Sequence, residues 1–501
     1  MKKKVIIFFL LLTFTNLFSQ NDNKNNDALK ILLSLNEQDA NNYNVKYLIG
    51  TNYYYANNNQ EAINWLTKCL GNLGNDAAIK KNNKLAPLET YFLLGKSYFY
   101  DYQFDKSIIM FEKYAKAVKQ SADKCINVDK YTRFALNAKK LINNPVNITK
   151  NNIKQLNSEY DDFKPLLNST EDLIIFTRKF NDNYEVYSSV KKAGKWQTPK
   201  KISKFNPEDN FIASSLSVDG TIMFLNKFEG KKWQIYTSIF DGQNWSLPKK
   251  LSKNINTSSN NRDATMSADG NKLYFSSDRE GGYGAFDIYY SKRLPNGEWG
   301  EVVNAGKEIN TDLNETSPLV FQDNTILYFS SDGYNSMGST DIFKARLGES
   351  NFFEKVENLG FPINTVYNDQ MGYVSVDYTK LYYSTYNEKH NKDIFKVELN
   401  KNEKKYLTVI ESYIRKKTNN SRVKDIIIDI YQKDNNKYVG TYKANPKTGK
   451  LTLVLKSGKK YIIKTKTDKY KLVDYVFDVP QNTNYFEIHK SIKFDVIGTV
   501  E

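Results

Sequence analysis

Five stretches of this 501-residue chain repeat one hairpin pattern, and this repetition limits the fold more than any other feature. Each stretch holds a run of aromatic and β-branched residues, a polar or Gly-rich turn and a second such run, which is typical of a β-hairpin. The stretches are LIIFTRKFNDNYEVY (173–187), IMFLNKFEGKKWQIY (222–236), LYFSSDREGGYGAFDIY (273–289), LYFSSDGYNSMGSTDIF (327–343) and LYYSTYNEKHNKDIF (381–395). The spacings are 48, 51, 54 and 54 residues when the hairpins are aligned on Phe176, Phe224, Phe275, Phe329 and Tyr383.

Two further strands complete each repeat. Asp-Gly turns suited to two-residue loops precede the second and third hairpins, at Asp219-Gly220 and Asp269-Gly270. A strand with an aromatic residue follows each of the first four hairpins, at Trp196, Trp245, Trp299 and Phe353. The units then end at Asn206, Asn256, Asn310 and Asn364. Four short strands with a period of about 40 to 50 residues predict the blades of a β-propeller.

The number of blades follows from the closing strands. Only four closing strands follow the five hairpins, and the segment 148–162, ahead of the first hairpin, resembles 354–369. A strand from the start of the ring that pairs with the last blade removes an open sheet edge. We therefore predict a five-bladed propeller over 148–400, with a six-bladed ring as the alternative if one blade is degenerate.

The S-x-D-G, LYFSSD and D-I-Y/F elements of these repeats resemble the WD40-like PD40 repeats of TolB and its relatives. TolB-type rings have six blades, whereas the count here gives five. A sialidase-type propeller is the rival, because SADG resembles an Asp-box. No Trp follows at Asp-box spacing, and Arg is scarce in the ring, so the rival fits less well.

Residues 20–147 are predicted to form a helical domain, because 27–142 place apolar residues at helical spacing. Two segments, 47–70 and 91–114, copy one pattern. Its matched positions are Gly50 and Gly95, Tyr53 and Tyr98, Ala62 and Ser107, and Leu66 and Phe111. The small residues at the first and third of these positions let two antiparallel helices approach closely. The pattern resembles the tetratricopeptide repeat, which implies two repeats that pack on their neighbours or present a groove to a partner.

The only cysteines are Cys69 and Cys125. An oxidising compartment permits a bridge between them without requiring one. Cys69 stands where the helical repeat calls for a small buried residue, which favours a packed thiol, and the pairing stays open.

Residues 401–501 alternate short β runs with Asn, Asp, Gly and Lys turns, which predicts a small β-sandwich. The order VKDIIIDIYQ, KTGKLTL, SGKKYIIKTKTDKY resembles the carboxypeptidase regulatory-like domain. That resemblance implies a transthyretin-like sandwich. The predicted fold class is thus multidomain: helical repeats, an all-β propeller and a β-sandwich.

Residues 1–19 combine three lysines with the short apolar run VIIFFLLLTFTNLF, which predicts a cleavable secretory signal. No later segment approaches the roughly 20 apolar residues of a membrane-spanning helix. We therefore expect an exported protein, located in the periplasm or at the periplasmic face of the outer membrane if the source is a Gram-negative bacterium.

The formal net charge of +16 is concentrated near the C-terminus. Residues 401–501 hold 22 Lys and Arg against 11 Asp and Glu, whereas 20–400 hold 47 against 45. A basic face suggests an anionic partner such as a cell-envelope glycan, although a lysine-rich surface also serves solubility. Nucleic acid is not expected as a partner, because no nucleic-acid motif accompanies the charge.

No catalytic constellation is recognisable in the sequence. The only histidines are His390 and His489, and the motifs of serine hydrolases, zinc peptidases and phosphate-binding loops are missing. We therefore expect a protein that is not an enzyme and that carries no cofactor.

The acidic, Gly-rich loop from Asp278 to Asp287 is a weak calcium candidate, because carboxylates and carbonyls on a tight loop are hard oxygen ligands. A repeat constraint explains it equally: Asp287, Asp341 and Asp393 precede a strand in three blades, where a carboxylate can accept hydrogen bonds from loop N–H groups. Tyr283 and Tyr334 on these loops are candidates for a partner-binding surface.

The order of signal peptide, tetratricopeptide repeats, PD40 propeller and regulatory-like sandwich resembles the OmpA-family, PorE-like proteins of Bacteroidetes. The resemblance implies a periplasmic scaffold or adaptor associated with the type IX secretion and gliding machinery, or with a PorP/SprF-like outer-membrane β-barrel. The family usually ends in an OmpA-like peptidoglycan-binding domain, and this sequence stops before one, so that mode of anchoring is not carried over. The alternative function is a glycan- or peptidoglycan-binding envelope module that uses the basic C-terminal domain.

Overall fold

The computed structural model describes most of the chain after the first 21 residues. The described ranges are 22–118, 122–181, 183–321, 323–348, 353–387, 391–399, 407–416, 421–424, 426–445, 448–465, 471–472, 475–481, 492–494 and 496–497. The predicted signal peptide and both histidines lie outside these ranges. Internal contacts divide the chain into two compact units, 1–144 and 145–501.

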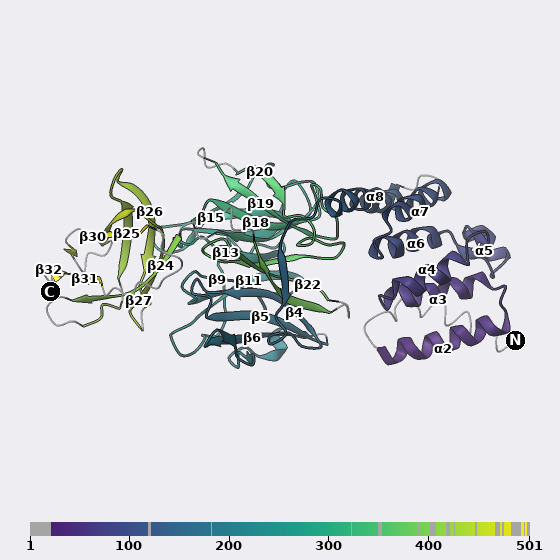
Figure 1. Ribbon diagram of the computed structural model, residues 1–501, viewed down its shortest axis with the longest axis horizontal. Coiled ribbons are helices and arrows are strands. Elements are labelled where there is room, and N and C mark those ends of the chain that lie inside the picture. The colour runs from purple at the N-terminus through teal and green to yellow at the C-terminus, as the bar shows by residue number, and fades with distance from the viewer. Residues whose placement is uncertain are drawn as a thin grey trace. The chain divides into compact units, whose positions relative to one another are not determined.

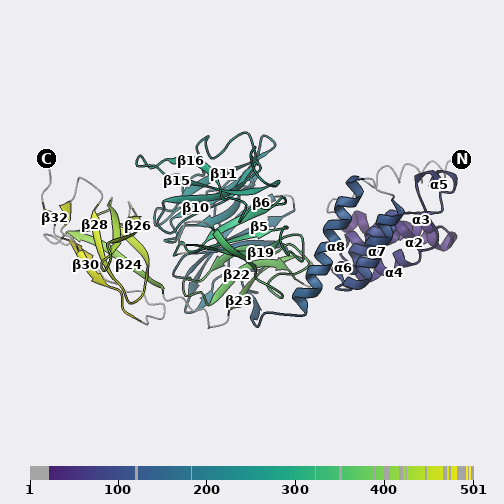
Figure 2. The same cartoon turned by 90° about the horizontal axis from the view of Figure 1, so that it is seen from above.

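The first unit is helical (Figures 1 and 2). Its helices are α2 (Asp22–Gln38), α3 (Tyr43–Tyr55), α4 (Asn59–Thr67), α5 (Asp76–Lys81), α6 (Glu89–Tyr100), α7 (Phe104–Ala117) and α8 (Ala122–Ile142). Two short strands, β1 (Leu73–Gly74) and β2 (Ala86–Pro87), pair in parallel between α4 and α6. The asparagine side chains at the N-caps of α3, α4 and α5 accept a hydrogen bond from a backbone N–H in the first turn, which fixes where these helices begin.

Helices α3 and α4, and likewise α6 and α7, form two closely packed pairs. A Cβ atom added to Gly50 would lie 2.7 Å from the Leu66 side chain, and one added to Gly95 would lie 2.6 Å from the Phe111 ring. The Ser107 hydroxyl donates to the Gly95 carbonyl over 2.8 Å. The repeated small residues are therefore required by the close approach of the paired helices.

The ring in the second unit consists of five antiparallel sheets. The first sheet contains β4 (Asp161–Leu167), β5 (Leu173–Phe180), β6 (Asn183–Lys192), β7 (Lys195–Trp196) and β8 (Lys200–Lys201). The second contains β9 (Ile212–Leu216), β10 (Ile222–Glu229), β11 (Lys232–Ile239) and β12 (Lys249–Lys250). The third contains β13 (Asn261–Met266), β14 (Lys272–Ser277), β15 (Asp287–Arg293) and β16 (Trp299–Asn304). The fourth contains β17 (Glu315–Val320), β18 (Ile326–Ser331), β19 (Asp341–Leu347) and β20 (Phe353–Asn358). The fifth contains β21 (Gln370–Val374), β22 (Lys380–Tyr386), β23 (Lys392–Glu398) and β3 (Thr149–Asn152).

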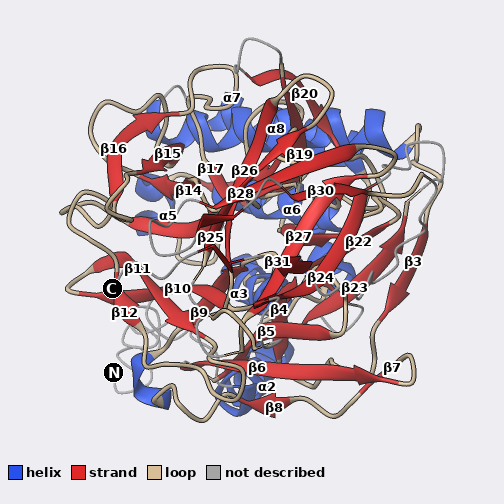
Figure 3. Cartoon of the chain, turned by 90° about the vertical axis from the view of Figure 1, so that its left-hand side faces the viewer, coloured by secondary structure: helices blue, strands red, loops and turns tan. Residues whose placement is uncertain are grey.

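The sheets close on themselves, as Figure 3 shows in a view along the ring. The first strands of the sheets contact one another in the cyclic order β4, β9, β13, β17, β21 and back to β4. Strand β3, from ahead of the first hairpin, pairs antiparallel with β23, with Asn152 opposite Phe395 and Thr149 opposite Glu398. This pairing confirms the predicted closing strand and the count of five sheets in a propeller-like β domain.

At the end of a repeat unit, an asparagine side chain makes hydrogen bonds to the backbone of the third strand of its sheet. The Asn256 side chain accepts from the Ile235 N–H and donates to the Ile235 carbonyl, each over 2.8 Å. The same double contact joins Asn310 to Ile288, Asn364 to Ile342 and, through the closing segment, Asn157 to Ile394. Asn206 differs, because its side-chain oxygen accepts a local hydrogen bond from the Glu208 N–H. Each double contact satisfies two backbone groups of a strand at once.

The alignment of the second repeat was wrong by one residue. Phe176 pairs with Tyr187, and Phe275 with Tyr289, but in the second sheet the residue opposite Tyr236 is Leu225. The pairing of β10 with β11 runs without a break from Ile222 opposite Ile239 to Glu229 opposite Lys232, so Leu225, and not Phe224, is the counterpart of Phe176 and Phe275.

The C-terminal part contains two larger sheets. One holds β24 (Leu407–Lys416), β27 (Lys450–Lys456) and β31 (Ile492–Phe494), and the other holds β25 (Ile427–Gln432), β26 (Lys437–Lys443), β28 (Lys460–Thr465) and β30 (Tyr475–Asp478). A two-stranded ladder joins β29 (Lys471–Leu472) to β32 (Val496–Ile497). One apolar cluster, including Ile410, Ile428 and Leu453, fills the space between the two larger sheets.

The C-terminal strands also contact the ring. Leu407 and Val409 of β24 belong to the same apolar cluster as Val376 and Tyr378, which lie in the turn between β21 and β22. The Asn271 amide, in the turn between β13 and β14, donates to the Tyr438 hydroxyl over 2.9 Å. These contacts cover the end of the ring at which the first strands of the sheets finish.

Within the described part of the chain, no helix is both long enough and apolar enough to cross a membrane.

Candidate functional site: the open mouth of the ring

The first strand of every sheet contains a β-bulge or irregularity near its middle. At three of these places a residue other than glycine has a positive φ: Lys164 at 53°, Asp263 at 57° and Ser317 at 50°. L-residues rarely adopt this conformation, and it concentrates at positions that the surrounding structure holds for a purpose. In this ring the positive φ directs a charged or polar residue from each of three sheets toward the centre.

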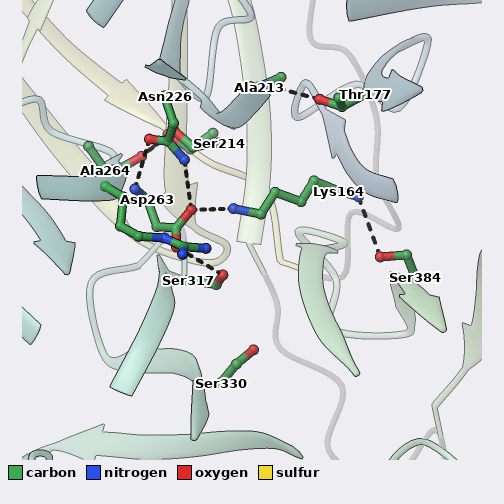
Figure 4. A network of polar contacts seen from close by, with 12 residues as sticks. Lys164, Thr177, Ala213, Ser214, Asn226, Asp263, Ala264, Ser317, Ser330 and Ser384 are labelled. Atoms are coloured by element: carbon green, nitrogen blue, oxygen red, sulfur yellow. Dashed lines mark hydrogen bonds and ion pairs between the residues drawn. The ribbon is translucent and has the colours of Figure 1, made fainter. Parts of the chain in front are cut away.

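Lys164 and Asp263 form a buried ion pair across the centre (Figure 4). Their side chains are 3% and 1% exposed. The Arg262 Nε donates to the second Asp263 oxygen over 2.8 Å. The Asn226 amide donates to Asp263 Oδ1 over 2.9 Å, and its own oxygen accepts from the Asp263 N–H over 2.9 Å. The Ser317 hydroxyl donates to Asp263 Oδ2 over 3.5 Å, so the carboxylate accepts hydrogen bonds from two cations, one amide and one hydroxyl.

The charges in this network set its protonation state. Burial by itself raises the pKa of the Asp263 carboxyl, but the Arg262 and Lys164 charges outweigh burial and hold that pKa below its usual range. Burial lowers the pKa of Lys164, and the Asp263 charge opposes that shift. We take the pair to be ionised at neutral pH, because the carboxylate also accepts hydrogen bonds that stabilise its charge.

The inner strands also touch each other at this level. A Cβ atom added to Gly372 in β21 would lie 2.5 Å from the Pro165 carbonyl oxygen in β4. The Lys164 N–H points to the Ser384 hydroxyl over 3.4 Å, so the first sheet is joined to the fifth. The ion pair and these contacts form a floor across the ring.

A cavity of about 300 Å³ lies on this floor. It is lined by residues at the starts of first strands and by residues beside the hairpin turns of the first, second and fifth sheets, so it opens at the end of the ring away from the C-terminal strands. Four cations line it, Lys164, Lys179, Arg262 and Lys392, against one carboxylate, Asp161. The remaining lining residues are Phe163, Tyr184, Ile212, Asn226, Trp233, Gln370 and Tyr386. The cavity is therefore both cationic and aromatic.

The Lys392 ammonium lies near two aromatic rings of the cavity wall. Its Nζ lies 5.7 Å from the centre of the Phe163 ring and 5.5 Å from that of Tyr386. Asp161 Oδ1 accepts from the Lys392 backbone N–H over 2.9 Å, and no ion pair of the Lys392 ammonium occurs among the described residues. Burial lowers the pKa of Lys392 to about 8, although the Asp161 charge acts in the opposite direction.

Exposed aromatic rings surround the same end of the ring. Phe180, Phe228 and Tyr283 stand at the hairpin turns of the first three sheets and are 43%, 55% and 54% exposed. The Phe228 ring lies 5.3 Å from the ring of Trp233, which lines the cavity. We call these three exposed residues the aromatic rim.

Tyr334 does not belong to this rim, which corrects the expectation from the sequence. Its hydroxyl donates to the Ile309 carbonyl over 2.6 Å, and its ring packs against Phe329 and Phe343. The loop of the fourth sheet folds back, so this tyrosine is half-buried.

The calcium candidates Asp278 and Asp287 already accept hydrogen bonds from the protein. Asp278 accepts from the backbone and side-chain N–H groups of Asn260, over 2.7 and 2.6 Å. Asp287 accepts from the Tyr283 and Gly284 N–H groups and from the Asn304 amide. Among the described residues, no group of three or more His, Cys, Asp or Glu side chains is arranged to hold a metal ion.

The other acidic repeat positions also have structural contacts. Asp341 accepts from the Met337 N–H over 3.0 Å, and Asp393 accepts from the Asn152 amide of the closing strand over 2.5 Å. Asp219 and Asp269 accept from the serine two residues earlier in the turns that join first and second strands. Cys69 is buried, its thiol points to the Tyr43 and Trp65 carbonyls, and burial raises its pKa to about 12. The side chain of Cys125 lies outside the described residues.

The sequence pattern did not indicate the mouth of the ring. Lys164 and Asp263 stand in segments, DDFKPLL and NRDATM, that were not part of the hairpin alignment. The sequence signal for Lys164 and Asp263 is a charged residue inside a strand that packs within the ring. An unpaired charge is rarely tolerated at such a buried position. That signal indicates a buried partner but does not say which residue it is.

The fold and this cavity define a closed, propeller-like ring with a cationic and aromatic mouth. No protein-family model and no curated protein matches the chain. Solved structures that match include TolB from Acinetobacter baumannii, with 16% identity over 49% of this chain and a TM-score of 0.32; the match spans 56% of that chain. A putative TolB from Agrobacterium tumefaciens matches with 13% identity over 50% of this chain and 96% of its own, with a TM-score of 0.28. A thermostable family-43 glycoside hydrolase matches with 14% identity over 48% of this chain and 90% of its own, with a TM-score of 0.35.

The expectation that the chain is not an enzyme is contradicted by these matches. The matching structures include a glycoside hydrolase, a puromycin-hydrolyzing peptidase and an α-L-arabinofuranosidase as well as TolB proteins. The lack of a familiar motif is therefore insufficient to exclude catalysis, because a fold does not determine a function.

Proposed function

We propose that this protein is an exported adaptor of the cell envelope whose ring binds another protein at its open mouth. The aromatic rim carries this proposal. Aromatic residues are enriched in protein interfaces, and exposed rings at the turns of three consecutive sheets, beside an open cavity, are a surface suited to a partner.

The closed ring supports the same proposal. Each sheet is fastened to its neighbours, and the floor is fixed by a buried ion pair, so the rim residues are held in position before a partner arrives. Preorganised surfaces lose less conformational entropy on binding.

The proposal also covers the types of the other domains, the compartment and the identity of the partners. The two helix pairs would be tetratricopeptide-type repeats that hold a second protein, and the C-terminal strands would be a transthyretin-like sandwich. The compartment would be the periplasm or the periplasmic face of the outer membrane. By the resemblance to OmpA-family, PorE-like proteins, the partners would belong to the type IX secretion and gliding machinery or be a PorP/SprF-like β-barrel.

The test is co-purification from envelope fractions of the source organism. The rim variant Phe180→Ser, Phe228→Ser, Tyr283→Ser is compared with a control, Ile239→Ser, Leu247→Ser, Val303→Ser, whose three positions are exposed apolar residues elsewhere in the ring. We expect the wild type and the control to recover the same protein in stoichiometric amount, and the rim variant to lose it. Equal recovery by all three would refute the proposal.

A glycan is the second candidate partner, favoured by the excess of 11 positive charges in residues 401–501. In that case the protein would stay on isolated sacculi, and raising the salt concentration would release it, because salt screens exposed charges.

A further inference from the structure

The cavity at the mouth of the ring has unmatched positive charge. Of its four lining cations, Lys164 and Arg262 are paired with Asp263 in the floor and Lys179 also has an interaction, whereas the Lys392 ammonium has no ion pair among the described residues. Asp161 is the one acidic residue in the lining, and its Oδ1 accepts from a backbone N–H. The wall around Lys392 thus attracts an anion, and the effect is strong because partial burial weakens the screening by water.

Aromatic rings hold Lys392 without neutralising it. A ring face attracts an ammonium by roughly 0.5 to 2 kcal/mol, which is less than a carboxylate provides when both groups are desolvated. Phe163 and Tyr386 are the two rings near its Nζ. The same rings, with Trp233 opposite, offer an apolar wall to the group that carries the anion.

The shape of the site limits how a ligand enters. The Lys164–Asp263 pair closes the floor, the close approach of Gly372 to Pro165 closes the seam beside it, and the C-terminal strands cover the other end of the ring. A polypeptide cannot thread through this ring. A ligand enters and leaves by one mouth, so it is a small molecule or the end of a chain.

A neutral hydrogen-bonding group also lines the cavity. The Gln370 side chain lines the cavity, and no hydrogen bond of its amide occurs among the described residues. An amide offers both a donor and an acceptor, which matches one peptide group of an extended chain.

We propose that the cavity binds the C-terminal carboxylate of a partner polypeptide, with Lys392 contacting the carboxylate and the aromatic wall contacting the last side chain. This inference rests on the proposed function, since it names the part of the partner that the mouth receives. Capture of a terminal carboxylate is a recurring mode of peptide recognition. A volume of about 300 Å³ is at the lower end of ligand sites and suits one or two residues.

The test uses the full chain and the probe acetyl-Ala-Ala-Phe, as the free acid and as the C-terminal amide, titrated by calorimetry. The variant is Lys392→Met, which keeps the stem between the rings and removes the charge. The matched control is Lys250→Met, at a cation of the second sheet that pairs with Glu229 and does not line the cavity. We expect the wild type and the control to bind the acid at least tenfold more tightly than the amide, and Lys392→Met to lose that preference.

Two results would overturn the inference. One is equal affinity for the acid and the amide in the wild type. The other is tighter binding of glucuronate than of the peptide acid, lost in Lys392→Met, which would make the cavity a site for sugar acids.

The two proposals fail separately. If the rim variant loses its partner while the peptide acid fails to bind, the terminal carboxylate is wrong and the adaptor function stands. If the peptide acid binds while no partner is recovered, the adaptor function is wrong and the cavity site stands.

Discussion

Replacing Lys164 by methionine is the most direct test of the floor of the ring. Methionine keeps most of the length of the lysine stem, so the change removes the charge with little loss of packing. The Asp263 carboxylate then remains buried with Arg262, Asn226 and Ser317 as partners. Removing one member of a buried ion pair costs about 3 to 5 kcal/mol, and the three surviving contacts place this change near the lower value, at about 3 kcal/mol.

Replacing Asp263 by asparagine should cost more than replacing Lys164. It leaves two buried or half-buried cations, Lys164 and Arg262, facing each other without an anion. We expect a loss of about 4 to 5 kcal/mol in the free energy of unfolding. The double variant should lose less than the sum of the single losses, because the two residues interact directly.

Urea unfolding followed by tryptophan fluorescence measures these losses in the ring. Four of the five tryptophans, Trp196, Trp233, Trp245 and Trp299, lie in residues 148–400, so the signal reports mainly on the sheets. With a denaturant slope of about 3 kcal/mol per molar, a loss of 3 kcal/mol lowers the midpoint by about 1 M.

The control for this experiment is Lys250→Met. Lys250 also pairs with a carboxylate of the ring, Glu229, but its side chain is 44% exposed, so its loss should cost less than about 1 kcal/mol. If Lys164→Met shifted the midpoint no more than Lys250→Met, the central ion pair would not stabilise the ring and the reasoning about the floor would be wrong.

Three further predictions concern the seam, the helix pairs and a buried acid. Asn157→Ala leaves the Ile394 N–H and carbonyl without their side-chain partner and should lower the urea midpoint by the equivalent of about 1 to 3 kcal/mol. Asn206→Ala, which removes only a local contact, should be near neutral. Equal effects of the two changes would show that the double contact of Asn157 does not stabilise the last sheet. Gly95→Ala pushes α6 and α7 apart and should lower the free energy of unfolding by about 1 to 3 kcal/mol, measured by thermal unfolding followed by circular dichroism. Lys113→Ala, at an exposed position, is the control and should have little effect. An unchanged stability of Gly95→Ala would refute the close approach of the two helices. Burial raises the pKa of Glu315 from 4.5 to about 7, so the native state keeps this proton longer than the unfolded state, and the free energy of unfolding should fall by up to about 3 kcal/mol between pH 4.5 and 7. Glu315→Gln should flatten that part of the stability profile measured by urea titration at each pH, and an unchanged slope would show that this carboxyl does not titrate there.

The repeated sheets were predictable because their signals are local. A hairpin is specified by alternation and a turn, and an Asp-Gly turn carries its own hydrogen bonds, as Asp219 shows by accepting from Ser217 and Thr221. The closing strand was also predictable, because the segment 148–162 resembles 354–369. In the structure Asn157 of this segment makes the same double contact as Asn256, Asn310 and Asn364.

The second repeat shows where local signals fail. Phe224 and Leu225 are both apolar and both buried, so the sequence cannot tell which of them lies opposite Tyr236. The pairing of β10 with β11 decides this, and the apolar character of the two side chains carries no trace of that register.

The mouth of the ring could not be derived for a different reason. Lys164 and Asp263 are 99 positions apart and come from the first and third sheets. The residues that line the cavity come one, two or a few at a time from separate sheets, and only the curvature of the ring brings them together. Repeat alignment finds what the sheets share, whereas this site is made of the positions at which they differ.

The seam between β3 and β23 has a consequence for the order of assembly. Asn152 and Asp393, which meet there, are 241 positions apart, and loop-closure entropy must be overcome before such a contact forms. During synthesis, the earliest strand of the ring, β3, emerges without its partner and stays unpaired until β23 has been made. Once the last hairpin has formed, its strand β23 presents a bare edge until β3 pairs with it, which makes this edge the place where a chaperone or a second unfinished copy would most readily attach.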